Sequence, residues 1–248
     1  MNQSFSADPP TTRKPYSSEL DGILLVDKPA DMTSHDVVNA VRGMFRIKKV
    51  GHGGTLDPSA TGLLVLLLGR ATKLSDRIMG GDKVYEGIMR LGVSSSTQDA
   101  EGELIPGTDP AGLSEVAVRA AMMSLTGDIY QTPPMVSALK KDGVPLYKLA
   151  RKGVVVEREP RLVHIYKFDL VDFGIPDSRI SVKCSKGTYV RTLCHDVGEK
   201  LGCGGLLASL RRIASGNFSI DGAIKFAEIK ELPREDLAKH VLPMVAAM

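Results

Sequence analysis

Residues 51–69 read GHGGTLDPSATGLLVLLLG, and this stretch decides the fold. Its second half, residues 63–68, is a run of six apolar residues bounded by Gly62 and Gly69. A run of that length is too short for a typical helix and is typical of a strand in the middle of a sheet. We therefore expect a central strand at residues 63–68, with a glycine-rich turn at residues 51–58 leading into it.

Apolar segments on both sides of this stretch predict further strands and helices. Residues 23–26 predict a short buried strand that ends at Asp27-Lys28-Pro29, and residues 84–91 and 179–184 predict two more strands. Apolar residues at helical spacing predict three helices. We expect the first to be capped by Ser34, the second to be capped by Ser114 and stopped by Gly127, and the third to carry Val190, Leu193, Cys194, Val197 and Leu201 on one face. This pattern predicts one α+β domain.

The composition excludes several classes of protein. With 43% hydrophobic and 25% charged residues among 248, the chain is typical of a globular protein. Residues 1–20 contain no apolar stretch, so they predict a flexible tail and no secretory signal, and the six-residue run is too short to cross a bilayer. Three cysteines without a CxxC pair indicate a reduced, cytoplasmic setting. The sequence also lacks the motifs typical of nucleotide hydrolysis, dinucleotide binding and zinc catalysis.

Positive charge is concentrated in two stretches, although the net charge is only +3. Residues 37–56 contain four basic residues and no acidic one, and residues 140–161 contain seven basic and three acidic residues, a surplus of 7 − 3 = 4. Two such stretches are compatible with a track for a polyanion, but on charge alone two solvated surfaces are the preferred interpretation.

Asp57 lies in a setting that suits either a binding loop or a simple turn. The glycines before it allow the backbone to approach a bulky ligand, because they lack a β-carbon. Pro58 disfavours helical geometry at Asp57, so the carboxylate projects from an extended or turn segment. Gly, Asp and Pro are also common in ordinary surface turns, and local chemistry alone favours that interpretation.

A second group of residues lies at the start of the third predicted helix. Residues 186–191 read KGTYVR and place Tyr189 and Arg191 in its first turn. A helix start attracts anions, so Arg191 could pair with a catalytic carboxylate or a phosphate, or it could lie on the exposed face of the helix. Tyr85 lies within a predicted strand, where an aromatic residue usually packs in the core.

Several motifs, taken together and in this order, resemble the TruB-type tRNA pseudouridine synthases. They are GILLVDKPADMTSHDVV, GHGGTLDP with SATGLLVLLLG, KVYEG, PPMVSALKKDGVPLYKLARKG, GTYVRTL and SLRR. The resemblance extends from about Gly22 to the region of Ser219. It implies the pseudouridine synthase catalytic fold, with a mixed, mainly antiparallel central sheet flanked by helices.

The resemblance also implies roles for individual residues. Asp57 is similar to the catalytic aspartate that cuts the N-glycosidic bond and lets the base rejoin through C5. It would act as a nucleophile toward the base or the ribose, or as a base toward the sugar. Arg191 is similar to the arginine that pairs with it, and Tyr85 to the tyrosine that stacks on the target base. Further substrate-binding positions are His52, Tyr189, Leu210 and Lys28. No metal or organic cofactor is implied.

The implied substrate is the uridine at position 55 in the T-loop of tRNA. Base chemistry of this kind requires the uridine to leave its stack, at a cost of roughly a few kcal/mol. Stacking on an aromatic ring recovers about 1–3 kcal/mol of this cost. The basic stretches then predict contacts with the RNA backbone, which we assign to Lys140, Lys141, Arg151 and Lys152. A monomer is expected.

Domain bounds and alternatives complete the expectation. We expect a tail at residues 1–20, a catalytic domain at residues 21–230 and a short segment at residues 231–248. The C-terminal PUA-like RNA-binding domain common in bacterial members is not expected. The alternative function is a tRNA-folding factor that binds and releases the loop without catalysis. A guide-RNA-dependent relative is a second alternative, which the short length disfavours.

Overall fold

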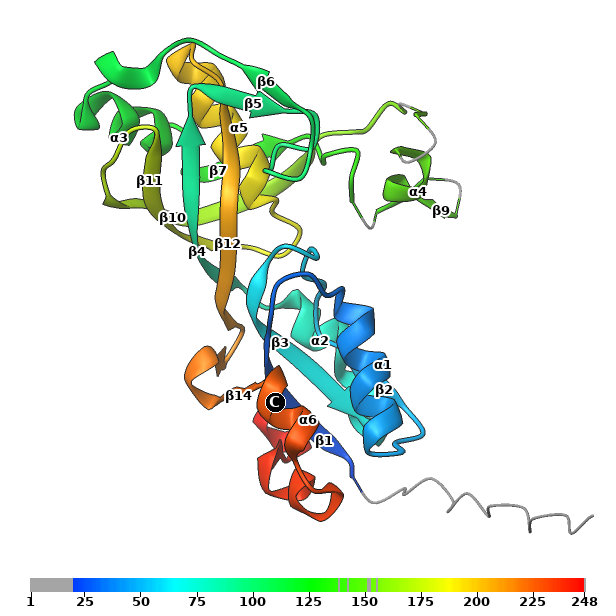
Figure 1. Cartoon of the computed structure of the whole chain (residues 1–248). Coiled ribbons are helices and arrows are strands. Elements are labelled where there is room, and N and C mark those ends of the chain that lie inside the picture. The colour runs from blue at the N-terminus through cyan, green and yellow to red at the C-terminus, as the bar shows by residue number, and fades with distance from the viewer. Residues whose placement is uncertain (1–19, 138, 142, 151–152, 155, 248) are drawn as a thin grey trace, which may run out of the picture.

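One long mixed sheet is the central element of the structure (Figure 1). The computed structural model describes residues 20–247 apart from residues 138, 142, 151–152 and 155. In order across the sheet, the strands are β14 (Ile224–Lys225), β1 (Gly22–Lys28), β3 (Thr61–Leu68), β12 (Gly205–Ser215), β4 (Lys83–Leu91), β11 (Asp177–Cys184), β10 (Arg161–Asp172) and β7 (Gly127–Gln131). The predicted α+β class with a mixed, mainly antiparallel sheet is confirmed, since only β1–β14 and β3–β12 pair in parallel among the strands of this path.

Short strands complete the structure around this path. Three of them extend the sheet: β2 (Val50–His52) pairs with β3, β13 (Phe218–Ser219) with β12, and β15 (Val241–Leu242) with β1. Two separate hairpins are β5 (Val93–Ser95) with β6 (Leu104–Pro106), and β8 (Lys140–Lys141) with β9 (Val144–Pro145).

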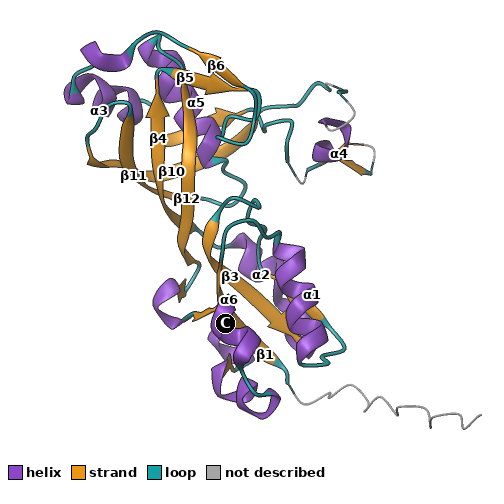
Figure 2. Cartoon of the chain, in the orientation of Figure 1, coloured by secondary structure: helices purple, strands orange, loops and turns teal. Residues whose placement is uncertain are grey.

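Helices cover the sheet at its two ends, which we call the lower and upper halves as they stand in Figure 1 (Figure 2). The lower half carries α1 (Ser34–Met44), α2 (Ser75–Gly80) and α6 (Phe226–Glu231); the upper half carries α3 (Glu115–Met123) and α5 (Val190–Leu201). The short α4 (Leu146–Ala150) stands away from the sheet together with β9. None of the helices in the described part of the chain is long and apolar enough to cross a membrane.

The predicted central strand is confirmed, because β3 is buried on both faces. Leu64, Leu66 and Leu68 pack against α1, while Leu63 and Val65 belong to a separate core with Ile78 of α2 on the opposite face. All six residues of the apolar run are at most 1% exposed. A continuous apolar run is what burial on both faces requires, since successive side chains of a strand alternate between faces.

The two halves are joined through a narrow parallel pairing between β3 and β12. Its register involves only Thr61 with Arg211 and Gly62 with Arg212. Gly62 has φ +95°, and a β-carbon there would lie 2.3 Å from the Arg212 carbonyl oxygen, so a larger residue would separate the strands. The loop that contains Asp57 enters β3 at this junction.

Three local predictions need correction. Thr33 caps α1, with Asp36 completing a reciprocal capping box, while Ser34 lies inside the helix and bonds elsewhere. The second helix ends at Met123, and Gly127 begins β7. The expected turn at residues 51–58 is partly strand, because β2 covers its first two residues. The strands near residues 23–26, 84–91 and 179–184 are confirmed, as is the third amphipathic helix, α5, although Tyr189 is its N-cap residue and does not lie in its first turn.

Candidate active site

Asp57 and Arg191, which lie far apart in the sequence, meet in an ion pair. The Arg191 Nη2 atom lies 2.8 Å from Asp57 Oδ2. The Arg191 side chain is 4% exposed, whereas the Asp57 side chain retains 44% of its surface. The arginine is therefore a buried support, and the carboxylate is the partner that a substrate can reach. This excludes the alternative in which Arg191 lies on the exposed face of its helix.

A second carboxylate, Asp99, holds the other side of the same guanidinium. Arg191 Nη1 donates to Asp99 Oδ2 at 3.1 Å. Asp99 is 8% exposed, and its other oxygen, Oδ1, accepts hydrogen bonds from the Thr97 hydroxyl and from the Glu101 N–H. Because each side of the guanidinium has its own carboxylate acceptor, the orientation of the Arg191 side chain is fixed. Asp99 was not among the residues predicted for the site.

The pKa of Asp57 reflects two opposing influences. Desolvation by the surrounding protein raises it above the ordinary aspartate value, the Arg191 charge opposes that effect, and the negative charge of Asp99 adds to it. The pKa of Glu101 is also raised, first by desolvation and then by the charges of Asp99 and Asp57. Two buried cations, Arg191 with the larger effect and Lys28 with the smaller, therefore favour the ionised form of Asp57 within a group of carboxylates.

Arg212 fixes the backbone of the loop that carries Asp57. Its side chain is buried and donates to three carbonyl oxygens, those of Leu63 at 2.7 Å and of Gly54 and Thr55 at 3.2 Å each. A β-carbon at Gly53 would lie 2.3 Å from Ile78 Cγ2, so the loop passes close to α2 at a position that requires glycine. The motif SLRR was noted in the sequence, but this function of Arg212 was not predicted.

Lys28 and Ser34 hold the two sides of the Asp57 loop. Lys28 is fully buried, and its Nζ donates to the carbonyl oxygens of Pro29, Met32 and Pro58 at 2.7–3.0 Å. Desolvation lowers the pKa of Lys28 to about 8. The Ser34 hydroxyl accepts from the Leu56 N–H at 2.9 Å and lies 3.2 Å from the Leu56 carbonyl oxygen. The residues on either side of Asp57 are thus both anchored.

Tyr85 and Leu210 lie where the cores of the two halves meet. Both side chains are partly buried, and each packs against the core of the upper half and that of the lower half. Tyr85 is paired with Arg212 across β4 and β12. Desolvation raises the pKa of Tyr85, while the Arg212 charge and its hydrogen bond to the phenol act in the opposite direction. The structure therefore brings the phenol close to the support of the Asp57 loop.

The two remaining predicted substrate residues lie on either side of this group. Tyr189 is the N-cap residue of α5, and its backbone N–H and C=O both bond to the Gln131 side chain, at 2.7 and 3.1 Å. His52 ends β2, and its Nδ1 accepts from the Gly54 N–H at 3.3 Å. Burial lowers the pKa of His52. His52 contacts the backbone of the loop, but no direct interaction links it to Asp57 in the described part of the chain.

The structure describes only part of the segment that holds the four residues assigned to contacts with the RNA backbone. Lys140 and Lys141 form β8, and the structure does not describe their side chains. Arg151 and Lys152 lie outside the described residues. Within the described residues, no three His, Cys, Asp or Glu side chains form a group of the kind that holds a metal ion.

The surroundings of Asp57 combine a half-exposed carboxylate with a fixed cation and an aromatic side chain. Arg191 supplies the cation, and Tyr85 lies within electrostatic range of the carboxylate. Such a site can stabilise charge that develops on a sugar or a base while excluding part of the solvent.

Comparison with known proteins gives one consistent family. The model described as TruB family pseudouridylate synthase (N terminal domain) matches residues 42–190, and that described as tRNA pseudouridylate synthase B C-terminal domain matches residues 191–248. A tRNA pseudouridine synthase B of Opitutus terrae is 49% identical over 229 residues, which cover 92% of this chain and 95% of that protein. The corresponding protein of Syntrophotalea carbinolica is 47% identical, over 92% of this chain and 75% of its own length.

Solved structures show the same fold. One chain of a Cbf5–Nop10–Gar1 complex superposes with a TM-score of 0.71 at 27% identity, covering 97% of this chain and 67% of that one. A chain of the archaeal box H/ACA sRNP Nop10–Cbf5 complex gives a TM-score of 0.69 at 26% identity and covers 92% of this chain. This chain spans 61% of the length of the latter.

Proposed function

Because the chain belongs to the TruB family of pseudouridine synthases and isomerises uridine to pseudouridine in tRNA, we propose that its target is the uridine at position 55 in the T-loop. The observation that carries the assignment of the site is the ion pair between the half-exposed Asp57 and the buried Arg191. A protein that only bound and released the loop would gain nothing from a carboxylate set among RNA phosphates. We propose that Asp57 is the catalytic group.

The other residues of the site then acquire specific roles. Arg191 keeps Asp57 ionised and aimed, and Asp99 holds Arg191. Tyr85 stacks on the flipped uracil and takes part in proton transfer at C5, with Leu210 beside it in the same pocket. His52 and Tyr189 contact the displaced nucleotide, and Lys28 supports the loop through the Pro58 carbonyl group. The N1–C1′ bond breaks, the uracil turns, and its C5 forms the new bond to C1′. The proton that leaves C5 is balanced by one taken up at N1, so the product is an isomer of the substrate.

Mapping of pseudouridine in a tRNA transcript treated with the purified chain tests the proposed target. We expect one pseudouridine, at position 55, and none in a transcript in which that uridine is replaced by cytidine. Modification at another position, or no modification of any tRNA, would overturn the assignment. Deletion of the T-arm from the transcript should abolish the reaction, because the loop shape is the expected recognition element.

Substitution of Asp99 tests its positioning of Arg191. Since catalysis needs ionised Asp57, the rate should fall as the pH drops through the raised pKa of that group. Asp99→Asn removes a like charge, so the acid limb of the kcat profile should move to lower pH. The maximal rate should also fall, by up to about a hundredfold, because Arg191 loses one of its two anchors.

The measurement is the single-turnover rate between pH 5 and pH 9, with Asp177→Asn as the matched control. Asp177 is also paired with an arginine, Arg90, but on the outer side of the upper half. An Asp99→Asn enzyme with the wild-type rate and the wild-type acid limb would exclude a positioning role.

The basic segment around α4 provides a test of backbone binding. We propose that Lys140, Lys141, Arg151 and Lys152 contact phosphates of the T-arm. Replacing all four by glutamine should weaken tRNA binding and reduce the slope of log K against log [salt] by about 3, since each phosphate contact contributes about 0.7–0.9. Filter binding at several salt concentrations gives this slope. If the slope is unaltered, these four residues belong to a solvated surface.

The remaining expectations on organisation stay proposals. We propose that residues 21–230 form the catalytic unit, that residues 231–248 are a short C-terminal segment, and that the enzyme acts as a monomer in the cytoplasm. Within the last segment, β15 pairs with β1 at Ile23 and Leu24. Gel filtration of the protein with and without tRNA tests the monomer, with a 1:1 complex as the expected result.

A further inference from the structure

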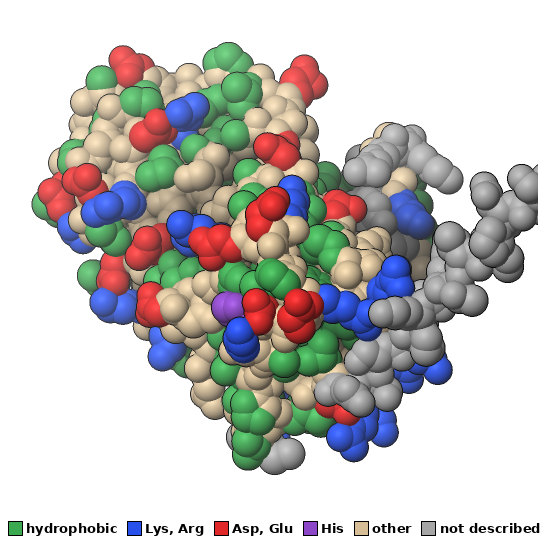
Figure 3. All heavy atoms as spheres, turned by 60° about the horizontal axis from the view of Figure 1, so that its bottom comes forward, with side chains coloured by type: hydrophobic (Ala, Val, Ile, Leu, Met, Phe, Trp, Pro, Cys, Tyr) green, Lys and Arg blue, Asp and Glu red, His purple; other side chains and the backbone are tan. Residues whose placement is uncertain are grey.

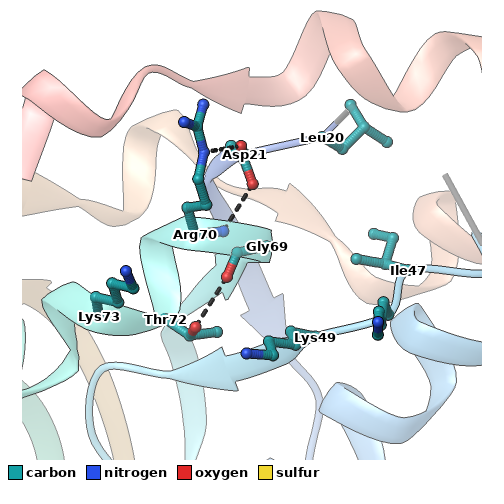
Figure 4. Close-up of a pocket in the computed structure, with 9 residues that line it drawn as sticks. Leu20, Asp21, Ile47, Lys49, Gly69, Arg70, Thr72 and Lys73 are labelled. Atoms are coloured by element: carbon teal, nitrogen blue, oxygen red, sulfur yellow. Dashed lines mark hydrogen bonds and ion pairs between the residues drawn. The ribbon is translucent and has the colours of Figure 1, made fainter. Parts of the chain in front are cut away.

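A pocket of about 500 Å³ lies in the lower half, at the opposite end of the strands from Asp57 (Figure 4). Three strands have one of their ends at this pocket: β1 and β2 begin there, and β3 ends there. Asp21 precedes β1, Lys49 precedes β2 and Gly69 follows β3. In the register, Gly22 and Val50 both pair with Leu68, whereas Lys28 pairs with Gly62 near the catalytic loop. Six steps of about 3.4 Å place the pocket roughly 20 Å from that loop.

The pocket is lined by four cations and one carboxylate. The cations are Lys48, Lys49, Arg70 and Lys73, and the carboxylate is Asp21. Arg70 satisfies Asp21 twice, through its side-chain Nε and through its backbone N–H at 2.6 Å. These two interactions lower the pKa of Asp21, so its carboxylate stays ionised. Arg70 compensates the charge of that carboxylate. The three lysines are exposed and have no ion-pair partner within the described residues.

The side chains are arranged around an open space. Figure 4 shows Lys49 and Lys73 on either side of Thr72, with Arg70 held against Asp21 above them. The Thr72 hydroxyl donates to the Gly69 carbonyl oxygen at 2.8 Å and so closes the turn after β3. Lys and Arg side chains also gather on the right-hand side of the face shown in Figure 3. A surplus of cations without protein partners, around a hollow, is suited to an anion.

We propose that this pocket binds a backbone phosphate of the tRNA, at a distance from the target uridine. Two links connect it to the catalytic loop. β2 follows Lys49 directly and ends at His52, which contacts that loop, and β3 runs from the loop back to Leu68, next to Gly69. At about 3.4 Å per nucleotide of one strand, 20 Å corresponds to roughly six nucleotides. The pocket therefore lies within reach of a helical stem whose loop is held at Asp57. This inference rests on the tRNA substrate of the proposed function.

The test is the variant Lys48→Gln/Lys49→Gln/Lys73→Gln, with Arg70 retained because it holds Asp21. We expect tRNA to bind about tenfold more weakly at moderate salt, and the salt slope to fall by about 1, because one phosphate contact is lost. The single-turnover rate at saturating tRNA should stay within twofold of wild type, because the substituted residues are remote from Asp57. The control Lys167→Gln/Lys183→Gln/Lys200→Gln removes the same charge from exposed lysines of the upper half and should change neither quantity by as much.

The outcomes separate this inference from the proposed function. Because the readout is binding, it is informative even if position 55 is not the modified uridine. Wild-type affinity and slope in the pocket variant would overturn the proposal, as would an equal loss in the control. A titration with inorganic pyrophosphate covers the other source of phosphate. If pyrophosphate binds the wild type and the pocket variant loses that binding while tRNA affinity stays unchanged, the pocket is a site for a free anion and the proposal is wrong.

Discussion

Asp57→Asn is expected to reduce pseudouridine formation by at least about a thousandfold while leaving the fold intact. The amide keeps the volume of the side chain and removes the charge that Arg191 faces at 2.8 Å. Tritium release from tRNA labelled at C5 of uridine measures the reaction directly. Turnover within tenfold of the wild type would exclude Asp57 as the catalytic group.

Binding of the same variant separates catalysis from tRNA folding. The Asp57→Asn variant should bind tRNA as tightly as the wild type, or slightly more tightly, because a negative charge near RNA phosphates has been removed. In cells that lack the wild-type protein, the variant should correct a growth defect that depends on tRNA binding alone. It should not restore pseudouridine in the tRNA. Asp177→Asn is the matched control and should retain full activity, since the Arg90–Asp177 pair lies away from the site.

Arg191→Lys is expected to lower kcat by about a hundredfold or more, although the positive charge is kept. The guanidinium reaches Asp57 and Asp99 with two different nitrogen atoms, and a single ammonium group cannot reproduce that fork. With weaker pairing, desolvation and Asp99 would raise the pKa of Asp57 further. The acid limb of the rate profile should therefore move to higher pH, the direction opposite to that expected for Asp99→Asn.

A matched substitution exists for this test as well. Arg90 forms two hydrogen bonds of 2.7 Å to Asp177 and is partly exposed. Arg90→Lys changes the same chemistry in a place without a catalytic role and should leave the rate unchanged. If Arg191→Lys and Arg90→Lys were equally active, the interaction of Arg191 with Asp57 would have no part in the reaction.

The fold could be predicted where one local pattern had a single structural meaning. Residues 63–68 have no polar position because both faces of β3 are buried. Strands β10 and β12 were not predicted. Both carry register shifts, at residues 165–167 and 170–172 in β10 and at residues 207–209 and 212–214 in β12, which interrupt the alternation of apolar residues. The cap of α1 was misplaced by one residue because Thr33 and Ser34 are both suitable caps.

The residues of the candidate site that could be predicted are those in motifs whose composition indicates a chemical role. Asp57 and Arg191 lie in motifs of unusual composition, and the structure brings them into contact. Asp99 meets Arg191 across 92 positions of sequence, and nothing in its local surroundings indicates that partner. Arg212 acts through carbonyl oxygens, which every residue possesses, so no pattern of side chains could reveal its partners.

The pairing of β1 has a consequence for synthesis of the protein on the ribosome. Val26 pairs with Ile224 and Ile23 with Leu242, so one edge of a strand near the start of the chain is covered by residues translated roughly 200 positions later. At about 5–20 residues per second, that edge stays open on the nascent chain for about 10–40 s. An open strand edge is a site of mispairing with other chains. During that interval the N–H and C=O groups along one edge of β1 have no strand partner from their own chain.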